Sequence, residues 1–140
     1  MRFMIIVKAN KDSEAGKLPS TELLEAMGKY NEQLAAAGVL VSAEGLHPTS
    51  KGARVKFSGA TRSVSQGPFD TQGLIAGFWI FEVKSKEDAI EWVKRCPNPF
   101  AGESEIEIRQ VFAPEDFGSN LTPELKKQEE HLRAQAAGKH

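Results

Sequence analysis

The feature that most constrains the fold of this sequence is a strand–helix–strand pattern that occurs twice. Its first copy begins with the continuous apolar run Phe3–Val7, which is typical of a strand buried on both faces and central in a sheet. Polar residues at Asn10–Lys17 indicate an exposed loop, after which Ser20 is placed to cap a helix. Spacings of four, three and four give that helix one apolar stripe: Leu23, Met27, Tyr30 and Leu34. Gly38 ends the helix, and a strand is expected over Val39–Glu44.

The second copy of the pattern begins with the strongest strand in the chain, Leu74–Val83. Ser85 is placed to cap the helix that follows, and Pro97 stops that helix. Its inward stripe consists of Ala89, Trp92, Val93 and Cys96. The last strand, Glu105–Phe112, alternates between isoleucines on one face and charged residues on the other. Such alternation predicts a strand with one packed face and one face that is wet or lines a cavity.

A short hairpin lies between the two copies. Its strands are expected over Arg54–Ser58 and Arg62–Ser65, around a turn at Gly59–Thr61. The complete order predicts an α+β fold of the ferredoxin-like kind, β-α-β-β-α-β with an inserted hairpin and a C-terminal helix. Two helices on one face of an antiparallel sheet leave the other face in need of cover, so a homodimer is expected. Four aromatic residues are candidates for that second face: Phe3, Phe57, Trp79 and Phe81.

The chain is expected to consist of one domain over residues 1–113, followed by a linker and amphipathic helix over residues 114–140. Thr122 is a candidate N-cap, with Pro123 at the first helical position. Leu125 and Leu132 lie seven residues apart and form a narrow apolar stripe among charged side chains. Such a stripe could dock on a groove or on a partner protein.

Composition excludes several classes of function. The net charge is −1, which argues against a nucleic-acid partner, and Cys96 is the single cysteine, which excludes an intramolecular disulfide and a thiolate zinc cluster. No cofactor and no metal site are expected. The apolar run at the N-terminus is too short for a signal peptide, and no segment approaches the ~20 apolar residues of a membrane span. We therefore expect a protein of the reducing cytoplasm with no membrane partner.

The tract Gln66-Gly67-Pro68-Phe69-Asp70 interrupts regular structure between the hairpin and the long strand. With the motifs around it, the tract resembles the YCII-related family, in particular its DGPF branch, over roughly Met1 to Leu132. The other motifs are Leu46-His47-Pro48, Arg54-Val55, Gly77-Phe78-Trp79, Asp88-Ala89-Ile90-Glu91-Trp92, Glu107-Ile108-Arg109 and Leu121-Thr122-Pro123-Glu124-Leu125. The chain departs from the DGPF pattern at Gln66, where the family has aspartate, and at Gln72, where a lysine is usual.

The resemblance implies a dimeric α/β-barrel-like assembly of two ferredoxin-like domains, with a cavity between the sheet and the loops. Some members of this family are proposed to be enzymes, and relatives lie beside extracytoplasmic-function sigma factors. The missing aspartate at Gln66 and the missing lysine at Gln72 put a carried-over acid–base role in doubt.

His47 and Asp70 are the candidate catalytic residues. An imidazole titrates near neutral pH and can act as a general acid or base, and Asp70 could orient it if the bend folds over the sheet. The alternatives are an exposed loop histidine in a turn and an aspartate that caps its own turn.

Five further residues are candidates for ligand binding: Arg54, Phe69, Trp79, Glu107 and Arg109. Charges on a sheet face are usually solvated or paired across strands, but in a dimeric barrel the same face could bind a carboxylate or phosphate. The aromatic residues suit a core or a pocket wall. Cys96 lacks a neighbouring histidine and is expected to be a buried, inert thiol.

Two functional hypotheses follow. In the first, the protein binds a small molecule in a pocket near the sheet and the dimer interface, where His47 transfers a proton, Asp70 orients His47 and Arg109 contacts an anion. In the second, the chain is a non-catalytic regulatory or interaction module that uses the helical tail. The sequence does not decide between them and identifies no substrate.

Overall fold

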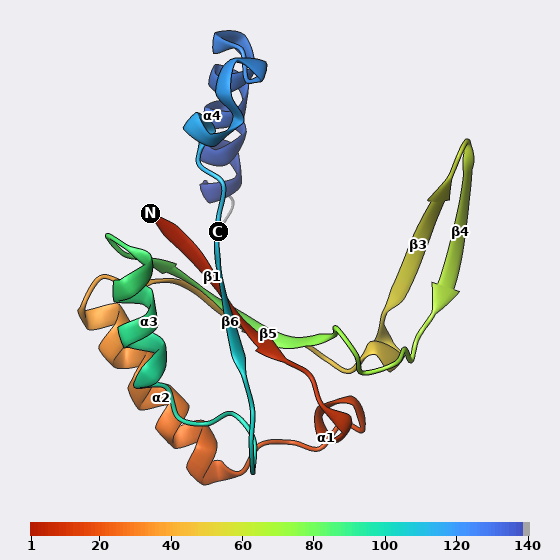
Figure 1. Ribbon diagram of the computed structural model, residues 1–140, viewed down its shortest axis with the longest axis vertical. Coiled ribbons are helices and arrows are strands. Elements are labelled where there is room, and N and C mark those ends of the chain that lie inside the picture. Colours follow the sequence, from red (N-terminus) through yellow and green to blue (C-terminus); the bar gives the residue numbers. More distant parts are fainter. Residues whose placement is uncertain (139–140) are drawn as a thin grey trace. The chain divides into compact units, whose positions relative to one another are not determined.

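The structure is a computed structural model that describes residues 1–138 (Figure 1). It divides into two compact units, Met1–Gln110 and a second unit that starts at Val111. The expected boundary after residue 113 remains a prediction.

A four-stranded antiparallel sheet forms the first unit. Its strands are β1 (Arg2–Lys8), β2 (Leu40–Gly45), β5 (Ile75–Glu82) and β6 (Ile106–Gln110). They lie in the order β2-β5-β1-β6, and each neighbouring pair is antiparallel. Each β-α-β unit therefore leaves room for a strand of the other unit between its own two strands. The predicted α+β fold with ferredoxin-like order, inserted hairpin and C-terminal helix is confirmed.

Two helices, α2 (Thr21–Ala36) and α3 (Lys86–Lys94), cover one face of the sheet (Figure 1). Both begin at the serines predicted to cap them, because the side chains of Ser20 and Ser85 accept hydrogen bonds from backbone N–H groups in the first turn. Tyr30 of α2 is buried and donates a hydrogen bond of 2.7 Å to the carbonyl of Trp92 in α3. This bond ties the two helices together, and burial raises the pKa of the Tyr30 hydroxyl well above its usual range.

The core lies between the sheet and these helices. Phe3, Ile5 and Val7 of β1 and Trp79 and Phe81 of β5 all face the helices and are buried. The suggestion that Phe3, Trp79 and Phe81 belong to the second face of the sheet is therefore wrong.

The other face of the sheet is only partly covered within this chain. Met4 and Ile6 alternate with the buried residues of β1, and Phe78 and Ile80 do the same in β5; all four are half-buried. The prediction that β1 is central is confirmed, because β5 and β6 pair with it on either side. The expectation that β1 is buried on both faces does not hold within one chain.

The segment expected to be a polar loop contains a one-turn helix, α1 (Lys11–Glu14). Asn10 caps it: the Asn10 side chain accepts from the backbone N–H of Ser13, and the Ser13 hydroxyl accepts from the N–H of Asn10. The sequence carried this capping box, but four residues are too few for an apolar period to reveal a helix.

The hairpin forms a separate two-stranded sheet, β3 (Ala53–Ser58) and β4 (Thr61–Gln66). Figure 1 shows it projecting away from the four-stranded sheet. Every residue of both strands is exposed, and Phe57 is 69% exposed.

The second unit contains a 3₁₀ segment, Pro114–Asn120, and helix α4 (Pro123–Ala137). The Thr122 hydroxyl caps α4 as predicted, accepting from the N–H of Leu125. Phe112 and Phe117 stack with ring centroids 4.9 Å apart. Within residues 1–138, no helix is both long and apolar enough to cross a membrane.

Candidate functional site

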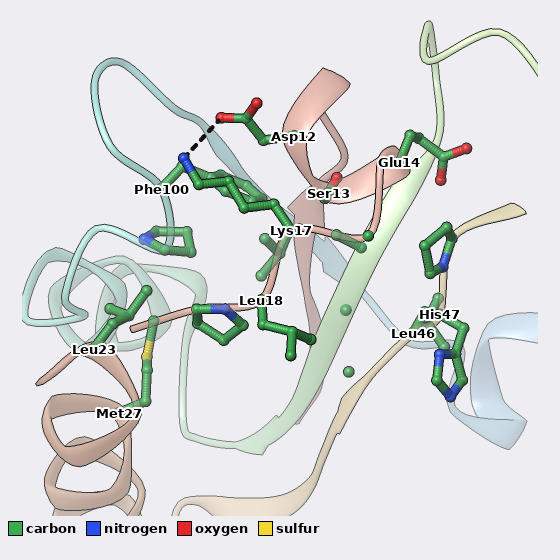
Figure 2. A pocket seen from close by; sticks show the side chains of 18 of the residues that line it. Asp12, Ser13, Glu14, Lys17, Leu18, Leu23, Met27, Leu46, His47 and Phe100 are labelled. Atoms are coloured by element: carbon green, nitrogen blue, oxygen red, sulfur yellow. Dashed lines mark ion pairs between the residues drawn. The ribbon is translucent and has the colours of Figure 1, made fainter. Parts of the chain in front are cut away.

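A cavity of about 1000 Å³ lies at one end of the four-stranded sheet. Its walls come from the segment that contains α1, the first turns of α2, the end of β2 with the loop after it, and the beginning of β5. Figure 2 shows part of this lining. Apolar side chains dominate it, among them Leu18, Leu23, Met27, Leu46, Trp79 and Phe100.

Trp79 is a fixed part of the cavity wall. Its indole Nε1 donates a hydrogen bond of 2.8 Å to Oδ1 of Asn31 in α2, and its ring meets Tyr30 edge to face. Because the polar atom of the indole is satisfied by Asn31, the ring presents an apolar surface. Sequence analysis proposed Trp79 as a ligand contact, and the residue does line the cavity.

Leu18 is the most exposed apolar residue on this cavity, at 84%. Leu24 also lines the cavity and is exposed. Exposed leucines on a concave surface are typical of a ligand or partner site rather than of a folding core.

Most of the charged groups along the cavity have internal partners. Lys17 lies 3.9 Å from Asp12, and both side chains are largely exposed (Figure 2). Glu14 accepts hydrogen bonds from Thr49: its Oε1 from the backbone N–H at 3.0 Å and its Oε2 from the hydroxyl at 2.5 Å. Glu14 thereby connects α1 to the loop that follows β2.

Thr49 carries this connection one step further. Its hydroxyl accepts a hydrogen bond of 2.9 Å from the backbone N–H of Phe69 in the Gly-Pro-Phe bend. Three segments far apart in the sequence therefore meet at one hydroxyl group. We call Glu14, Thr49 and Phe69 the clasp.

Gly67 allows the bend to approach this closely. A Cβ atom on Gly67 would lie 1.7 Å from the carbonyl oxygen of Thr49, and the N–H of Gly67 donates to the carbonyl of Gly52 at 2.9 Å. The Gly67–Pro68 peptide bond is cis. The tract thus supports the loop through its backbone and does not supply side chains to the cavity.

His47 lies in the loop after β2, two residues before Thr49, and its exposed side chain lines the cavity. Figure 2 shows Leu46 and His47 well separated from Leu18, Leu23 and Met27, so the cavity extends between these groups. Among residues 1–138 no hydrogen bond holds the imidazole.

Asp70 is not brought to His47. Its Oδ1 accepts a hydrogen bond of 3.3 Å from the backbone N–H of Gln72, and its side chain is exposed. Within the described part of the chain, Asp70 neither bonds to His47 nor lines the cavity. This geometry matches the alternative reading, in which the aspartate caps its own turn.

Arg54 and Phe69 form a pair of their own at the base of the hairpin. The guanidinium carbon of Arg54 lies 3.9 Å from the centroid of the Phe69 ring. Neither residue lines the cavity. Their contact packs the first strand of the hairpin against the bend.

Glu107 and Arg109 lie on β6, where they pair with Ile6 and Met4 on the partly covered face of the sheet. Glu107 bonds to Lys8 at 2.9 Å and to Arg109 at 3.2 Å. The Lys8 hydrogen bond is the main cause that lowers the pKa of Glu107, with the Arg109 bond second. These residues do not line the cavity, so the structure does not unite them with His47 in one pocket.

Cys96 is partly buried at the end of α3, and its thiol lies 3.2 Å from the carbonyl of Pro97. Burial raises the pKa of this thiol to about 11, so it is protonated at neutral pH. Within residues 1–138, no three histidine, cysteine or acidic side chains gather in an arrangement that could hold a metal ion.

Sequence analysis missed the clasp and the leucines at the cavity. The capping box around Asn10 could have revealed that the loop before α2 is ordered, and hence that Glu14 has a fixed position. No pattern in the sequence indicates that Thr49 would meet Glu14, 35 residues away, and Phe69, 20 residues away.

Comparison with known proteins supplies a family but no activity. No curated protein matches the chain. A solved structure that resembles it is 5-chloro-2-hydroxyhydroquinone dehydrochlorinase from Burkholderia phenoliruptrix AC1100, in complex with 2,5-dihydroxybenzoquinone. The two are 17% identical, with a TM-score of 0.45 over 80% of this chain and 94% of that chain. The model of the YCII-related domain matches residues 1–113, and the chain therefore belongs to the YCII-related family.

Proposed function

We propose that this protein binds a small molecule with a substantial apolar surface in the cavity beside α1 and α2. The cavity itself carries the proposal: at about 1000 Å³ it can hold a drug-sized ligand, and its lining is mainly apolar with a few polar groups at the edge. The N–H of Trp79 is already bonded to Asn31, so its ring offers only apolar surface. This ring and the exposed Leu18 favour a ligand with a flat or extended apolar group.

His47 is the proton-transfer group of this proposal. Within the described residues 1–138 it is the only histidine that lines the cavity, and imidazole can exchange a proton at neutral pH. Because Asp70 caps its own turn, His47 would act without Asp70 as an orienting partner. Glu107 and Arg109 could contact a ligand only at a second site, on the partly covered sheet face.

A homodimer is part of the same proposal. Met4, Ile6, Phe78 and Ile80 form an apolar centre on the sheet face that α2 and α3 do not cover. A sheet stabilises a fold by burying both of its apolar faces, and a second copy could cover this one. A monomer at micromolar concentration in a sedimentation experiment would contradict this part of the proposal.

The cavity is tested with an apolar fluorescent probe, 8-anilinonaphthalene-1-sulfonate, followed by displacement of the probe with a library of small aromatic and aliphatic acids. Leu18→Glu should weaken probe binding, because it places a charge on the apolar surface. Val41→Glu is the control, since Val41 is also an exposed apolar residue but lies in β2 and does not line the cavity. Equal binding by both variants would remove the cavity as the binding site.

The role of His47 needs a separate variant. His47→Gln should bind displacing compounds with little change but abolish any pH dependence of their binding or conversion between about pH 5 and pH 8. A pH profile that is the same in His47→Gln and the parent protein would show that His47 transfers no proton.

The alternative function, a non-catalytic interaction module, has one observation in its favour. Leu125 is 47% exposed and Leu132 is 53% exposed on α4. A variant that ends before Leu121 should then lose its protein partners in a pull-down. Unchanged partners and unchanged mass in light scattering would reject this alternative.

A further inference from the structure

The β3–β4 hairpin differs from the rest of the first unit in its exposure. None of its residues is buried, whereas every other strand of the unit has residues packed against the core. An isolated two-stranded hairpin is at best marginally stable in water, and both of its outer edges offer free backbone groups. A segment of this kind is normally completed by a partner.

One face of the hairpin is apolar. Val55 pairs with Val64 across the ladder, Phe57 lies two residues further along the same face, and all three are large exposed side chains. Arg62 covers part of the Phe57 ring, with its guanidinium carbon 4.5 Å from the ring centroid. A stripe of two valines and a phenylalanine is not needed for solubility or for the turn, so it indicates a docking surface.

The hairpin is also strongly basic. It contains Arg54, Lys56 and Arg62 and no acidic residue, which gives it a charge of +3. The whole chain carries −1, so the remaining residues carry −4. The hairpin and the rest of the protein are therefore opposite in charge.

Exposed carboxylates elsewhere in the first unit offer the complementary surface. Glu22, Glu25 and Glu32 of α2, and Glu103 and Glu105 before β6, are all exposed. Within residues 1–138 none of these five forms an ion pair. The hairpin projects away from the sheet of its own chain, so these groups are most readily met on another molecule (Figure 1).

We propose that the β3–β4 hairpin is an arm that docks on a second copy of this chain. The stripe of Val55, Phe57 and Val64 supplies the apolar contact, and Arg62 on the same face pairs with carboxylates of the second copy. Lys56 lies on the opposite face and adds to the long-range attraction between the basic arm and the acidic body. In a symmetric pair each copy gives one arm and receives one. Docking of the arm on the second copy requires no ligand in the cavity.

The test compares two arm variants with a matched control. Val55→Thr/Phe57→Thr/Val64→Thr removes the stripe but keeps residues that favour strands. Lys56→Glu/Arg62→Glu reverses the charge of the arm. Lys84→Glu/Lys86→Glu makes the same change in net charge at exposed positions outside the arm.

The dimer dissociation constant is measured for each protein by sedimentation velocity over a range of concentrations, with subunit exchange as the readout if the dimer is too tight. Both arm variants should dissociate at least about tenfold more readily than the parent, and the control should change far less. An arm variant that behaves like the control would overturn the proposal, as would a parent protein that is monomeric throughout.

Hydrogen exchange provides a measurement that needs no variant. Backbone amides of Ala53–Gln66 should exchange more slowly as the protein concentration rises through the dissociation constant. Exchange of these amides that is fast at every concentration would reject docking. A third result would assign the arm to a nucleic acid instead. A duplex DNA probe would bind the parent protein tightly and in a salt-sensitive way, and Lys56→Glu/Arg62→Glu would abolish this binding without changing dimerisation.

Discussion

The four-stranded sheet and the β3–β4 hairpin are built from the same backbone pairing but differ completely in burial. In β1 and β5 alternate residues are buried against α2 and α3, and Phe81 is 0% exposed. In β3 and β4 the ladder is equally regular over six residue pairs, and every side chain is exposed. Hydrogen-bonded pairing contributes little net stability by itself, so the packing of side chains distinguishes the region that holds the fold from the region available for contacts.

The largest expected effect tests this contrast directly. Phe81→Ala should reduce the free energy of unfolding by about 3–5 kcal/mol, because it leaves a cavity in the closed core between the sheet and the helices. Urea unfolding followed by circular dichroism measures the change.

Phe57→Ala is the matched change in the hairpin. In dilute protein it should alter the free energy of unfolding by less than about 0.5 kcal/mol, since the side chain is exposed. Equal losses for Phe57→Ala and Phe81→Ala would show that the hairpin is folded into the core, and the contrast between the two regions would fail.

The second prediction concerns the point where the hairpin returns to the sheet. Gly67→Ala should destabilise the protein by roughly 2–3 kcal/mol, because the new Cβ would overlap the carbonyl oxygen of Thr49 and the backbone must move apart. Gly77→Ala is a graded comparison, since its Cβ would lie 2.9 Å from the carbonyl oxygen of Glu44. Thermal unfolding should rank Gly67→Ala as the more harmful change, and the reverse order would mean that the bend is looser than its contacts indicate.

The third prediction removes only the hydroxyl of the clasp. Thr49→Val keeps the shape of the side chain but leaves the N–H of Phe69 without its acceptor, at a cost of about 1–2 kcal/mol. The Phe69 amide should exchange with solvent much faster, while the amides of the β3–β4 ladder should be unaffected. Thr49→Ser retains the hydroxyl and should behave like the parent protein. A slow Phe69 amide in Thr49→Val would show that the clasp does not hold the bend.

The smallest effect is expected at neutral pH for Cys96. Because burial raises the pKa of its thiol to about 11, the folded protein should react slowly with a thiol reagent at pH 7 and faster only near that pKa. Above about pH 9 the unfolded chain loses this proton while the folded protein retains it, so stability should fall as pH rises from about 9 to 11. Rapid reaction at pH 7 would show that the segment after α3 opens and exposes Cys96.

The fold could be predicted from the sequence where local chemistry determines it. Ser20, Ser85 and Thr122 were identified as helix caps from their positions before apolar or acidic turns, and all three accept the expected backbone hydrogen bonds. The repeated strand–helix–strand order was enough to predict the arrangement of the four-stranded sheet.

The side of the sheet that each residue faces could not be predicted in the same way. Period-two alternation shows that Trp79 and Phe81 share a face, but the position of the helices decides which face is buried. The core therefore includes Phe3, Trp79 and Phe81, which sequence analysis named as candidates for the opposite face.

In the candidate site, too, local chemistry could be predicted from the sequence but contacts between distant segments could not. His47 and Trp79 were selected for their chemistry, and both line the cavity. The expected partnership of His47 with Asp70 required a contact between two loops that sequence spacing does not define. The observed link between the two loops is made by Thr49, which joins the N–H of Phe69 in the bend to Glu14.

The two ends of the hairpin are joined to each other by the hydrogen bond from Gly67 to Gly52, and the clasp ties the bend after β4 to Glu14 of α1. A protein engineer can therefore treat everything beyond that anchor as an exchangeable module. Arms that are shortened, lengthened or carry a fluorophore at the Gly59 turn can be transplanted without redesigning the core. Partner choice could in this way be altered while the cavity and its histidine are left untouched.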